Sequence, residues 1–455
     1  MRILLVNPYI YDFTAFDLWL RPLGLLYIAS VLRRYTDAEL YWLDALDRFQ
    51  ENAFPPGESV TQYTQANGQG KYHRETVERP QIYADIPRTY ARYGIPLPAF
   101  LDKRDAIPEV DLILMTSLMT YWIDGVRLTL ETLKSRFPRA KVVVGGILPT
   151  LIPHDLLRCY VNADYWVHGY GEEEILTIIQ AENGRVYPHP DLTRIDHIPE
   201  PAVDFLSNRD ILPLMTSRGC PFQCTYCASN RLNPHFIERE PQAVYEDIYR
   251  HHEMYGTRHF IIFDDALLIN KRRRFLTVFQ KVKDHLNVHF HTPNGLHAGE
   301  IDRETAETMF ASGFKTLRLS FESTREEILA RSSNKVSVRQ MIQAVENLEA
   351  AGYQRRELDV YLLFGFPGQR VDDIREALDF VGDLGVNPHL SFYSPVPGTQ
   401  DFIRMQESGV LSTPVNLYET NKIYFLYHKS GLNREAIAHL KNMANRMVVP
   451  PDHRK

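Results

Sequence analysis

The stretch Met215–Asn230, MTSRGCPFQCTYCASN, contains three of the four cysteines in this 455-residue chain. Cys220, Cys224 and Cys227 lie within eight residues of one another. An apolar strand is predicted to begin near Leu212, so the cysteines fall in the loop that follows its carboxyl end. Three clustered thiols do not form a secreted disulfide framework, and in a reducing compartment they indicate metal or redox chemistry.

The residues after this loop continue as a series of strand–helix units. Helices are predicted over 241–256 and 337–352, among others, and they close at glycines that suit helix C-caps, namely Gly256, Gly313, Gly352 and Gly385. The strands are predicted to begin near Leu212, His259, Val288, Thr316, Leu358 and Pro388. Six successive parallel units favour a partial (β/α)6 TIM-type barrel over residues 209–402, with its active site at the carboxyl ends of the strands.

The residues before the loop predict a second α/β domain. Short apolar strands over 2–8, 38–46, 111–117 and 141–146 alternate with amphipathic helices. Continuous apolar strands favour an open parallel sheet that helices cover on both faces, so we expect a Rossmann-like domain over residues 1–185. The loops after Pro8, Thr116 and Gly145 should line one crevice at the carboxyl edge of this sheet.

The remaining predictions concern three segments and one cysteine. Residues 47–110 form a long insertion rich in tyrosine and arginine, either packed against the rest of the protein or acting as a lid over a ligand. Residues 186–208 are a proline-rich linker, and residues 403–455 predict a small helical C-terminal region packed under the barrel. Cys159 is expected to be a small buried hydrophobic residue.

Composition excludes several classes of protein. The chain has 51 Lys and Arg against 57 Asp and Glu, a net charge of −6, and no block of like charges that would bind nucleic acid or a membrane surface. The N-terminal run MRILLVNPY is too short for a signal peptide, and no segment approaches the roughly 18 apolar residues that cross a bilayer. We therefore expect a cytoplasmic protein without a membrane span and without a nucleic-acid partner.

The number of clustered thiols separates two kinds of metal site. Structural zinc takes four ligands, and a fourth cysteine is not at hand, although His251 or His252 could complete a site in principle. Three thiolates instead suit a 4Fe-4S cluster in which one iron has no protein ligand. That iron would be open to a substrate or a cofactor.

The Cys-x3-Cys-x2-Cys spacing, with Tyr226 just before the last cysteine, resembles the signature of radical S-adenosylmethionine (SAM) enzymes. The resemblance implies that Cys220, Cys224 and Cys227 hold a 4Fe-4S cluster that binds and reductively cleaves SAM. The resulting 5′-deoxyadenosyl radical would abstract hydrogen from a substrate. Such a reaction needs an electron donor of the flavodoxin or ferredoxin type.

Other positions resemble the SAM contacts of that family. Where the family often has Gly-Gly-Glu, this chain has Asp264 and Asp265, either of which could bind the amino group of SAM, although both could also form an exposed acidic turn. Ser320 and Glu322 lie two residues apart on a strand, hence on one side, and resemble the ribose contacts. The adenine turn resembles the stretch with Gly365 and Gly368, and residues 394–400 resemble the closing turn; both could equally be plain loops.

The N-terminal domain resembles the cobalamin-binding domain of one radical SAM subgroup. Thr116 and Leu118, then Gly145 and Gly146, match the elements that hold the nucleotide tail of cobalamin there. The loop after the first strand, NPYIYDFTAFDLW, lacks Asp-x-His-x-x-Gly and so offers no histidine to cobalt. Gly169–Glu174 also resembles the subgroup, and Met119–Trp122 could face a corrin or pack in the core.

The resemblance leaves three functions open. The first is cobalamin-dependent methylation of an unactivated carbon, and the second is a radical rearrangement, cyclisation or oxidation without cobalamin. A tRNA methylthiolating enzyme is related but needs three further cysteines, which this chain lacks. The third is a non-catalytic cobalamin or iron–sulfur sensor. The substrate could be a lipid, a polyketide, a peptide or a small metabolite.

Overall fold

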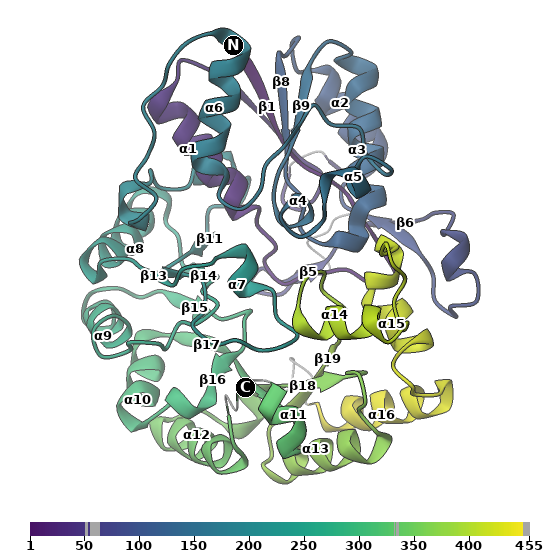
Figure 1. Ribbon diagram of the computed structural model, residues 1–455. Coiled ribbons are helices and arrows are strands. Elements are labelled where there is room, and N and C mark those ends of the chain that lie inside the picture. Colours follow the sequence, from purple (N-terminus) through teal and green to yellow (C-terminus); the bar gives the residue numbers. More distant parts are fainter. Residues whose placement is uncertain (51–52, 55–63, 332, 334–335, 449–455) are drawn as a thin grey trace. The chain divides into compact units, whose positions relative to one another are not determined.

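The computed structural model describes residues 1–50, 53–54, 64–331, 333 and 336–448. The chain folds into two compact units, unit 1 over Met1–Arg209 and unit 2 over Asp210–Lys455. Each unit has a parallel β-sheet covered by helices (Figure 1).

Unit 1 is built on a five-stranded parallel sheet of Rossmann type. The three central strands, over 2–7, 112–115 and 141–144, are almost entirely apolar and buried, which is why both faces of the sheet need a cover. In order across the sheet they are β10 (Tyr165–Trp166), β9 (Lys141–Val144), β8 (Leu112–Met115), β1 (Arg2–Asn7) and β4 (Glu39–Asp44). Figure 1 shows two pairs of helices flanking this sheet: α1 (Leu23–Tyr35) with α6 (Gly171–Asn183), and α2 (Leu97–Asp105) with α3 (Ile123–Arg136).

The described part of the insertion 47–110 packs within unit 1. Its strands β6 (Arg74–Thr76) and β7 (Ala91–Tyr93) form an antiparallel sheet with β2 (Ile10–Asp12), which follows β1. The described tyrosines of the insertion are buried, and Tyr83 and Tyr90 have their rings 5.6 Å apart. This agrees with the packed alternative; residues 51–52 and 55–63 of the insertion lie outside the described part.

Unit 2 contains the predicted partial barrel. Its six parallel strands start within two residues of the predicted positions. In sheet order they are β11 (Ile211–Leu214), β14 (His259–Ile262), β15 (His289–His291), β17 (Phe314–Glu322), β18 (Leu358–Phe364) and β19 (Asn387–Phe392). The short β16 (Leu296–His297) pairs with β17 beside β15, and the sheet stays open between β11 and β19.

Helices surround the convex side of this sheet (Figure 1). Gly256, Gly313 and Gly352 cap their helices with positive φ as predicted, whereas α13 has Leu384 as its C-cap and Gly385 follows with φ 70°. The helices are α8 (Pro241–Tyr255), α9 (Phe275–His285), α10 (Arg303–Ser312), α12 (Val338–Ala351), α13 (Val371–Asp383) and α16 (Arg434–Met447). The last of these belongs to the predicted C-terminal helical region, and it buries its apolar face in the core of unit 2.

One prediction about the core is wrong. Cys159 is exposed, because it follows the short helix α5 (His154–Leu157) in a surface turn where Leu157 and Val161 occupy the buried positions. Among the residues that the structure describes, no helix is long and apolar enough to cross a membrane.

Candidate active site

The cysteine loop leaves the carboxyl end of β11, as the sequence predicts. A short hairpin of β12 (Ser217–Arg218) and β13 (Ile237–Glu238) brackets it. Gly219 begins the loop with φ +88°, and a Cβ there would lie 2.6 Å from the carbonyl oxygen of His235, so no other residue fits. Within the loop, the Cys227 amide donates to the Cys224 carbonyl at 3.1 Å.

The three thiols share one electrostatic environment. Cys227 reaches solvent, yet desolvation by the surrounding loop raises the pKa of its thiol to about 11. Cys224, Asp265 and Cys220 raise this pKa further because nearby negative charge disfavours a thiolate. Iron ions would offset this charge, so the donor set fits an iron–sulfur cluster.

A single metal ion fits this loop less well. In the described part of the chain, no three His, Cys, Asp or Glu side chains are grouped as ligands for one ion. His251 is buried in α8, and His252 Nδ1 lies 2.9 Å from the Thr257 carbonyl oxygen, so the structure does not support the zinc alternative. In a cluster each cysteine binds its own iron, and the thiolates need not converge on one ion.

Asp264 and Asp265, at the carboxyl end of β14, have different partners. Asp264 is buried and accepts hydrogen bonds from the Thr216 amide at 2.7 Å and from the Thr216 and Ser217 hydroxyls at 2.6 Å each. Asp265 is half-buried and accepts from the Ser229 hydroxyl at 2.5 Å, two residues after Cys227. Asp265 therefore contacts the cysteine loop through Ser229 and lines the neighbouring pocket, whereas Asp264 is held by the residues just before that loop.

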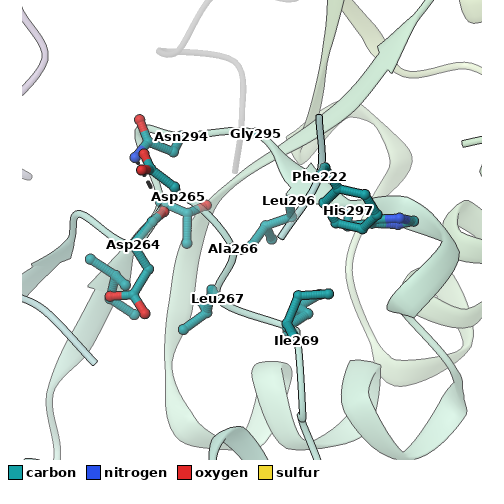
Figure 2. A pocket seen from close by; sticks show the side chains of 13 residues that line it. Phe222, Asp264, Asp265, Ala266, Leu267, Ile269, Asn294, Gly295, Leu296 and His297 are labelled. Carbon is teal, nitrogen blue, oxygen red and sulfur yellow. Dashed lines mark hydrogen bonds between the residues drawn. The ribbon is translucent and has the colours of Figure 1, made fainter. Parts of the chain in front are cut away.

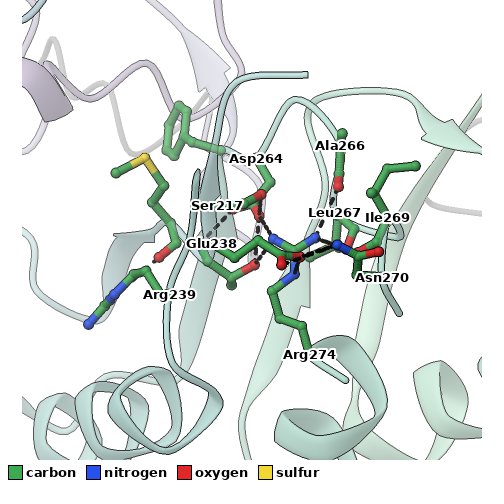
Figure 3. A network of polar contacts seen from close by, with 12 residues as sticks. Ser217, Glu238, Arg239, Asp264, Ala266, Leu267, Ile269, Asn270 and Arg274 are labelled. Carbon is green, nitrogen blue, oxygen red and sulfur yellow. Dashed lines mark hydrogen bonds and ion pairs between the residues drawn. The ribbon is translucent and has the colours of Figure 1, made fainter. Parts of the chain in front are cut away.

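Arg274 contacts the loop of residues 264–269, called the acidic loop below, and the sequence did not predict this role. Its Nη1 lies 3.1 Å from Asp264, and its Nη2 donates to the carbonyls of Ala266, Leu267 and Ile269 at 2.7–3.1 Å (Figure 3). The side chain is 2% exposed although it ends the basic run Lys271–Arg274. Such a run predicts a solvated surface, so the sequence carried no signal for this role.

A pocket lies beside the acidic loop. Figure 2 shows Asp265 and Asn294 at one end of it, while Phe222 and His297 lie together at the other, with ring centroids 5.0 Å apart. Phe222 belongs to the cysteine loop, between Cys220 and Cys224. The pocket therefore joins the cysteine loop to the carboxyl ends of β14 and β15.

Glu322 ends β17 in a strained conformation. Its φ is +71°, in the left-handed region that costs a non-glycine residue about 1–3 kcal/mol. The pairing of β17 with β18 shifts between Ser320 and Glu322, so the predicted strict alternation of these two residues is interrupted. The Glu322 side chain hydrogen-bonds with Tyr226, whose pKa is raised chiefly by burial and then by the charge of Glu322. Strain that places a carboxylate on the cysteine loop is typical of a functional site.

Of the other predicted contacts of unit 2, Ser320 and Gly365 are enclosed by neighbouring residues. A Cβ on Gly295 would come within 2.1 Å of Ser320 Oγ, so this loop covers the Ser320 hydroxyl. A Cβ on Gly365 would meet Leu426 of α15 (Lys422–His428) at 2.7 Å, whereas Gly368 borders open space. Gln369 holds the turn by accepting from the Gly365 amide at 3.0 Å.

Two residues far along the chain fasten the cysteine loop. The Thr225 hydroxyl donates to Asp401 at 2.6 Å, and the Thr225 amide donates to the Arg331 carbonyl at 2.9 Å. Arg331 Nη2 in turn donates to Asp401 at 2.7 Å, and its guanidinium lies 3.9 Å from the centre of the Phe366 ring. Asp401 directly follows the predicted closing turn at 394–400, in the first turn of α14 (Gln400–Glu407).

The predicted cobalamin contacts lie at neighbouring strand ends in unit 1. Gly146 has φ +92°, and a Cβ there would come within 2.4 Å of the Ser117 carbonyl oxygen and 3.2 Å of the Thr116 hydroxyl. A Cβ on Gly145 would meet only Val167, at 3.7 Å, which leaves room for a slender group. Leu118 packs on an apolar cluster that includes the buried Tyr121 and Trp122. These residues fit a nucleotide tail, while the loop after β1 supplies no histidine for cobalt.

Comparisons with known proteins agree with both units. A family described as the radical SAM superfamily matches residues 214–381, and the B12 binding domain matches residues 96–179. An uncharacterized methyltransferase of Pyrococcus horikoshii, PH0819, is 26% identical over 57% of this chain and 61% of its own length. The chain thus spans less than two thirds of that relative. The cytidylyl-2-hydroxyethylphosphonate methyltransferase of Streptomyces wedmorensis is 23% identical over 93% of this chain and 85% of its own length.

Solved structures show the same fold. The radical SAM methyltransferase TsrM from Kitasatospora setae, with cobalamin and a [4Fe-4S] cluster bound, aligns with a TM-score of 0.66 at 16% identity, over 99% of this chain and 92% of its own. The cobalamin-dependent radical enzyme OxsB aligns with a TM-score of 0.56 at 14% identity, over 100% of this chain and 62% of its own. Membership of the family implies a 4Fe-4S cluster, SAM and a source of electrons. The chain thus carries a domain of the radical SAM superfamily over residues 214–381, preceded by a B12-binding domain over residues 96–179.

Proposed function

We propose that this enzyme transfers a methyl group to an unactivated carbon with the help of cobalamin. The observation that carries the proposal is the union, in one chain, of a three-cysteine loop at the head of a partial barrel with a B12-binding domain. Both relatives named above are methyltransferases by name. The bound cluster would supply the electron that splits SAM into methionine and a 5′-deoxyadenosyl radical, and bound cobalamin would carry the methyl group.

The residues of this chain have separate tasks in the proposal. Cys220, Cys224 and Cys227 hold the cluster, and the open side of the acidic loop lets Asp265 bind the amino group of SAM. Glu322 accepts hydrogen bonds from the ribose hydroxyls, with Tyr226 fixing its orientation. Asp264 has a structural task instead, because the hydrogen bonds to it hold the acidic loop. Thr116 and Gly145 border the cobalamin tail.

Radical chemistry without cobalamin is the second candidate. It is favoured by one observation, the loop after β1, which has no histidine between Asn7 and Trp19. Cobalamin without a protein ligand to cobalt remains compatible with the first candidate. The products of SAM distinguish the two, because methyl transfer through cobalamin consumes one SAM to S-adenosylhomocysteine and a second to 5′-deoxyadenosine.

The test uses the full chain, reconstituted without oxygen with iron, sulfide and cobalamin, then given SAM and a strong reductant. We expect bound corrin, 5′-deoxyadenosine and S-adenosylhomocysteine. Deoxyadenosine alone, without bound corrin, would favour the cobalamin-independent enzyme. The absence of deoxyadenosine would support a sensor and overturn the proposal.

Cys224→Ala should abolish cluster absorbance and deoxyadenosine formation, because it removes one of three iron ligands. Cys159→Ala is the matched control: Cys159 is an exposed thiol of unit 1, and its removal should leave both signals unchanged. Retained SAM cleavage in Cys224→Ala would refute the assignment of the cluster.

A further inference from the structure

The inner, concave face of the barrel sheet is polar. Alternate residues of its strands join the core under the outer helices, for example Leu317, Leu319 and Phe321 of β17 and Val360, Leu362 and Phe364 of β18. The residues between them therefore face the inner side. These include His259, His289, His291, Thr316, Arg318, Ser320, Asp359, Tyr361 and His389. A barrel interior that serves only for packing is filled by branched apolar side chains.

Neutral side chains of β14, β15 and β17 pair with each other on this face. His259 Nδ1 lies 2.9 Å from His291 Nε2, and His291 Nδ1 lies 2.9 Å from the Thr316 hydroxyl oxygen. Burial lowers the pKa of His291 to about 3 and also lowers the pKa values of His259 and His289. These imidazoles are therefore uncharged near neutral pH, and the buried positive charge of the face comes from Arg318.

Arg318 is buried, with 6% of its surface exposed, and part of its guanidinium has no partner. Nη1 donates to the Tyr361 hydroxyl, and that hydroxyl donates to the Pro293 carbonyl at 3.0 Å. Nε lies 4.0 Å from Asp359, beyond hydrogen-bonding distance, and it has no hydrogen-bond partner among the described residues. A buried N–H of a charged group is costly to leave unpaired, so this edge of Arg318 lacks an acceptor that the rest of the described chain does not supply.

Tyr361, the partner of Arg318, lies close to a residue that lines the pocket of the candidate active site. Gly295 lines that pocket, and a Cβ on Gly295 would lie 2.1 Å from Ser320 Oγ and 3.3 Å from the Tyr361 ring. The loop 292–295 thus separates the pocket from the Arg318–Tyr361 pair.

We propose that Arg318 binds an oxyanion of the substrate, a carboxylate or a phosphate group, on the inner face of the barrel. Guanidinium groups pair with both groups through charge-assisted hydrogen bonds. The substrate class is then a small anionic metabolite with several hydrogen-bonding groups, because a lipid chain would leave the polar side chains of this face unpaired. The inference rests on the proposed function, since it describes the substrate of the same reaction.

The test measures anion binding to the reconstituted full chain without turnover. Inorganic phosphate and malonate are titrated at constant ionic strength, and binding is followed by the rise in melting temperature and, for phosphate, by 31P line broadening. The variants are Arg318→Gln and Arg318→Lys. The matched control is Arg258→Gln, which removes an arginine whose side chain is 67% exposed and paired with Asp210.

We expect the wild-type chain and Arg258→Gln to bind at least one anion, and Arg318→Gln to bind it about tenfold more weakly or worse. Preference for phosphate would indicate a phosphorylated substrate, and preference for malonate a carboxylic acid.

If Arg318→Gln does not fold, Arg318→Lys decides, because it keeps the charge but loses Nε and should bind severalfold more weakly. Absence of binding to the wild type, or equal binding by the Arg318 variants, would overturn the inference. Deoxyadenosine formation by the wild type, measured separately, shows whether the proposed function stands when this inference fails.

Discussion

Asp264 and Asp265 are neighbours in the sequence, but their surroundings give them different roles. Asp264 pairs with Arg274 where both side chains are at most 2% exposed, and breaking such a buried pair costs about 3–5 kcal/mol. Asp264→Asn should therefore lower the melting temperature markedly. Asp265→Asn should leave the melting temperature nearly unchanged and weaken SAM binding about tenfold, because a charge-assisted contact is lost. Calorimetry with SAM titration checks both; the opposite assignment would follow if Asp264→Asn were stable and only its SAM affinity fell.

Single residues also show where sequence patterns stop being informative. The cysteines and the two aspartates could be placed because their position depends on the strand before them. Arg274 could not, since its partners are the carbonyls of a loop whose shape no local pattern encodes. The left-handed conformation of Glu322 was likewise invisible, because glutamate gives no sign of positive φ in a sequence.

At the scale of elements, the cysteine loop is fastened to a distant helix, α14. Thr225 and Asp401 are 176 residues apart, and their 2.6 Å hydrogen bond joins the loop to α14. Thr225→Val removes this bond, so iron should leave the reconstituted cluster severalfold faster in the presence of a chelator. Thr225→Ser keeps the hydroxyl and should behave as the wild type. Equal rates of iron loss in the two variants would mean that the contact does not hold the loop.

The helices and strands differ in how far the sequence alone could predict them. Strands such as β17 and β18 have a buried apolar residue at every second position, and helices such as α8 end at a glycine, so both are encoded locally. The antiparallel sheet of the insertion was not predicted, because its strands are three residues long or shorter and pair across residues 13–90. The contacts of Thr225 with Asp401 and Arg331 were not predicted for the same reason, because contacts between remote segments leave no periodic signal in the sequence.

At the scale of the whole molecule, a buried carboxyl in unit 1 should make that unit sensitive to pH. Asp44 ends β4, is 3% exposed, and accepts from Asn7 Nδ2 at 2.7 Å and from the Leu46 amide at 2.8 Å. Burial, and then the charge of Asp47, raise the pKa of Asp44 from 3.8 to about 7. Because the folded state holds this proton more tightly than the unfolded state, the contribution of Asp44 to stability is largest below about pH 4 and is lost as the pH rises towards 7.

All four tryptophans, Trp19, Trp42, Trp122 and Trp166, belong to unit 1, so their fluorescence reports the unfolding of that unit. In urea, we expect the wild-type fluorescence midpoint to fall between pH 5 and pH 8. Asp44→Asn cannot lose a proton and should show a smaller fall, by roughly 2 kcal/mol in unfolding free energy. Asp155→Asn, which changes an exposed carboxylate of unit 1, should follow the wild type. If the urea midpoints of Asp44→Asn and the wild type fell in parallel, the pH dependence would have to come from another titratable group of unit 1.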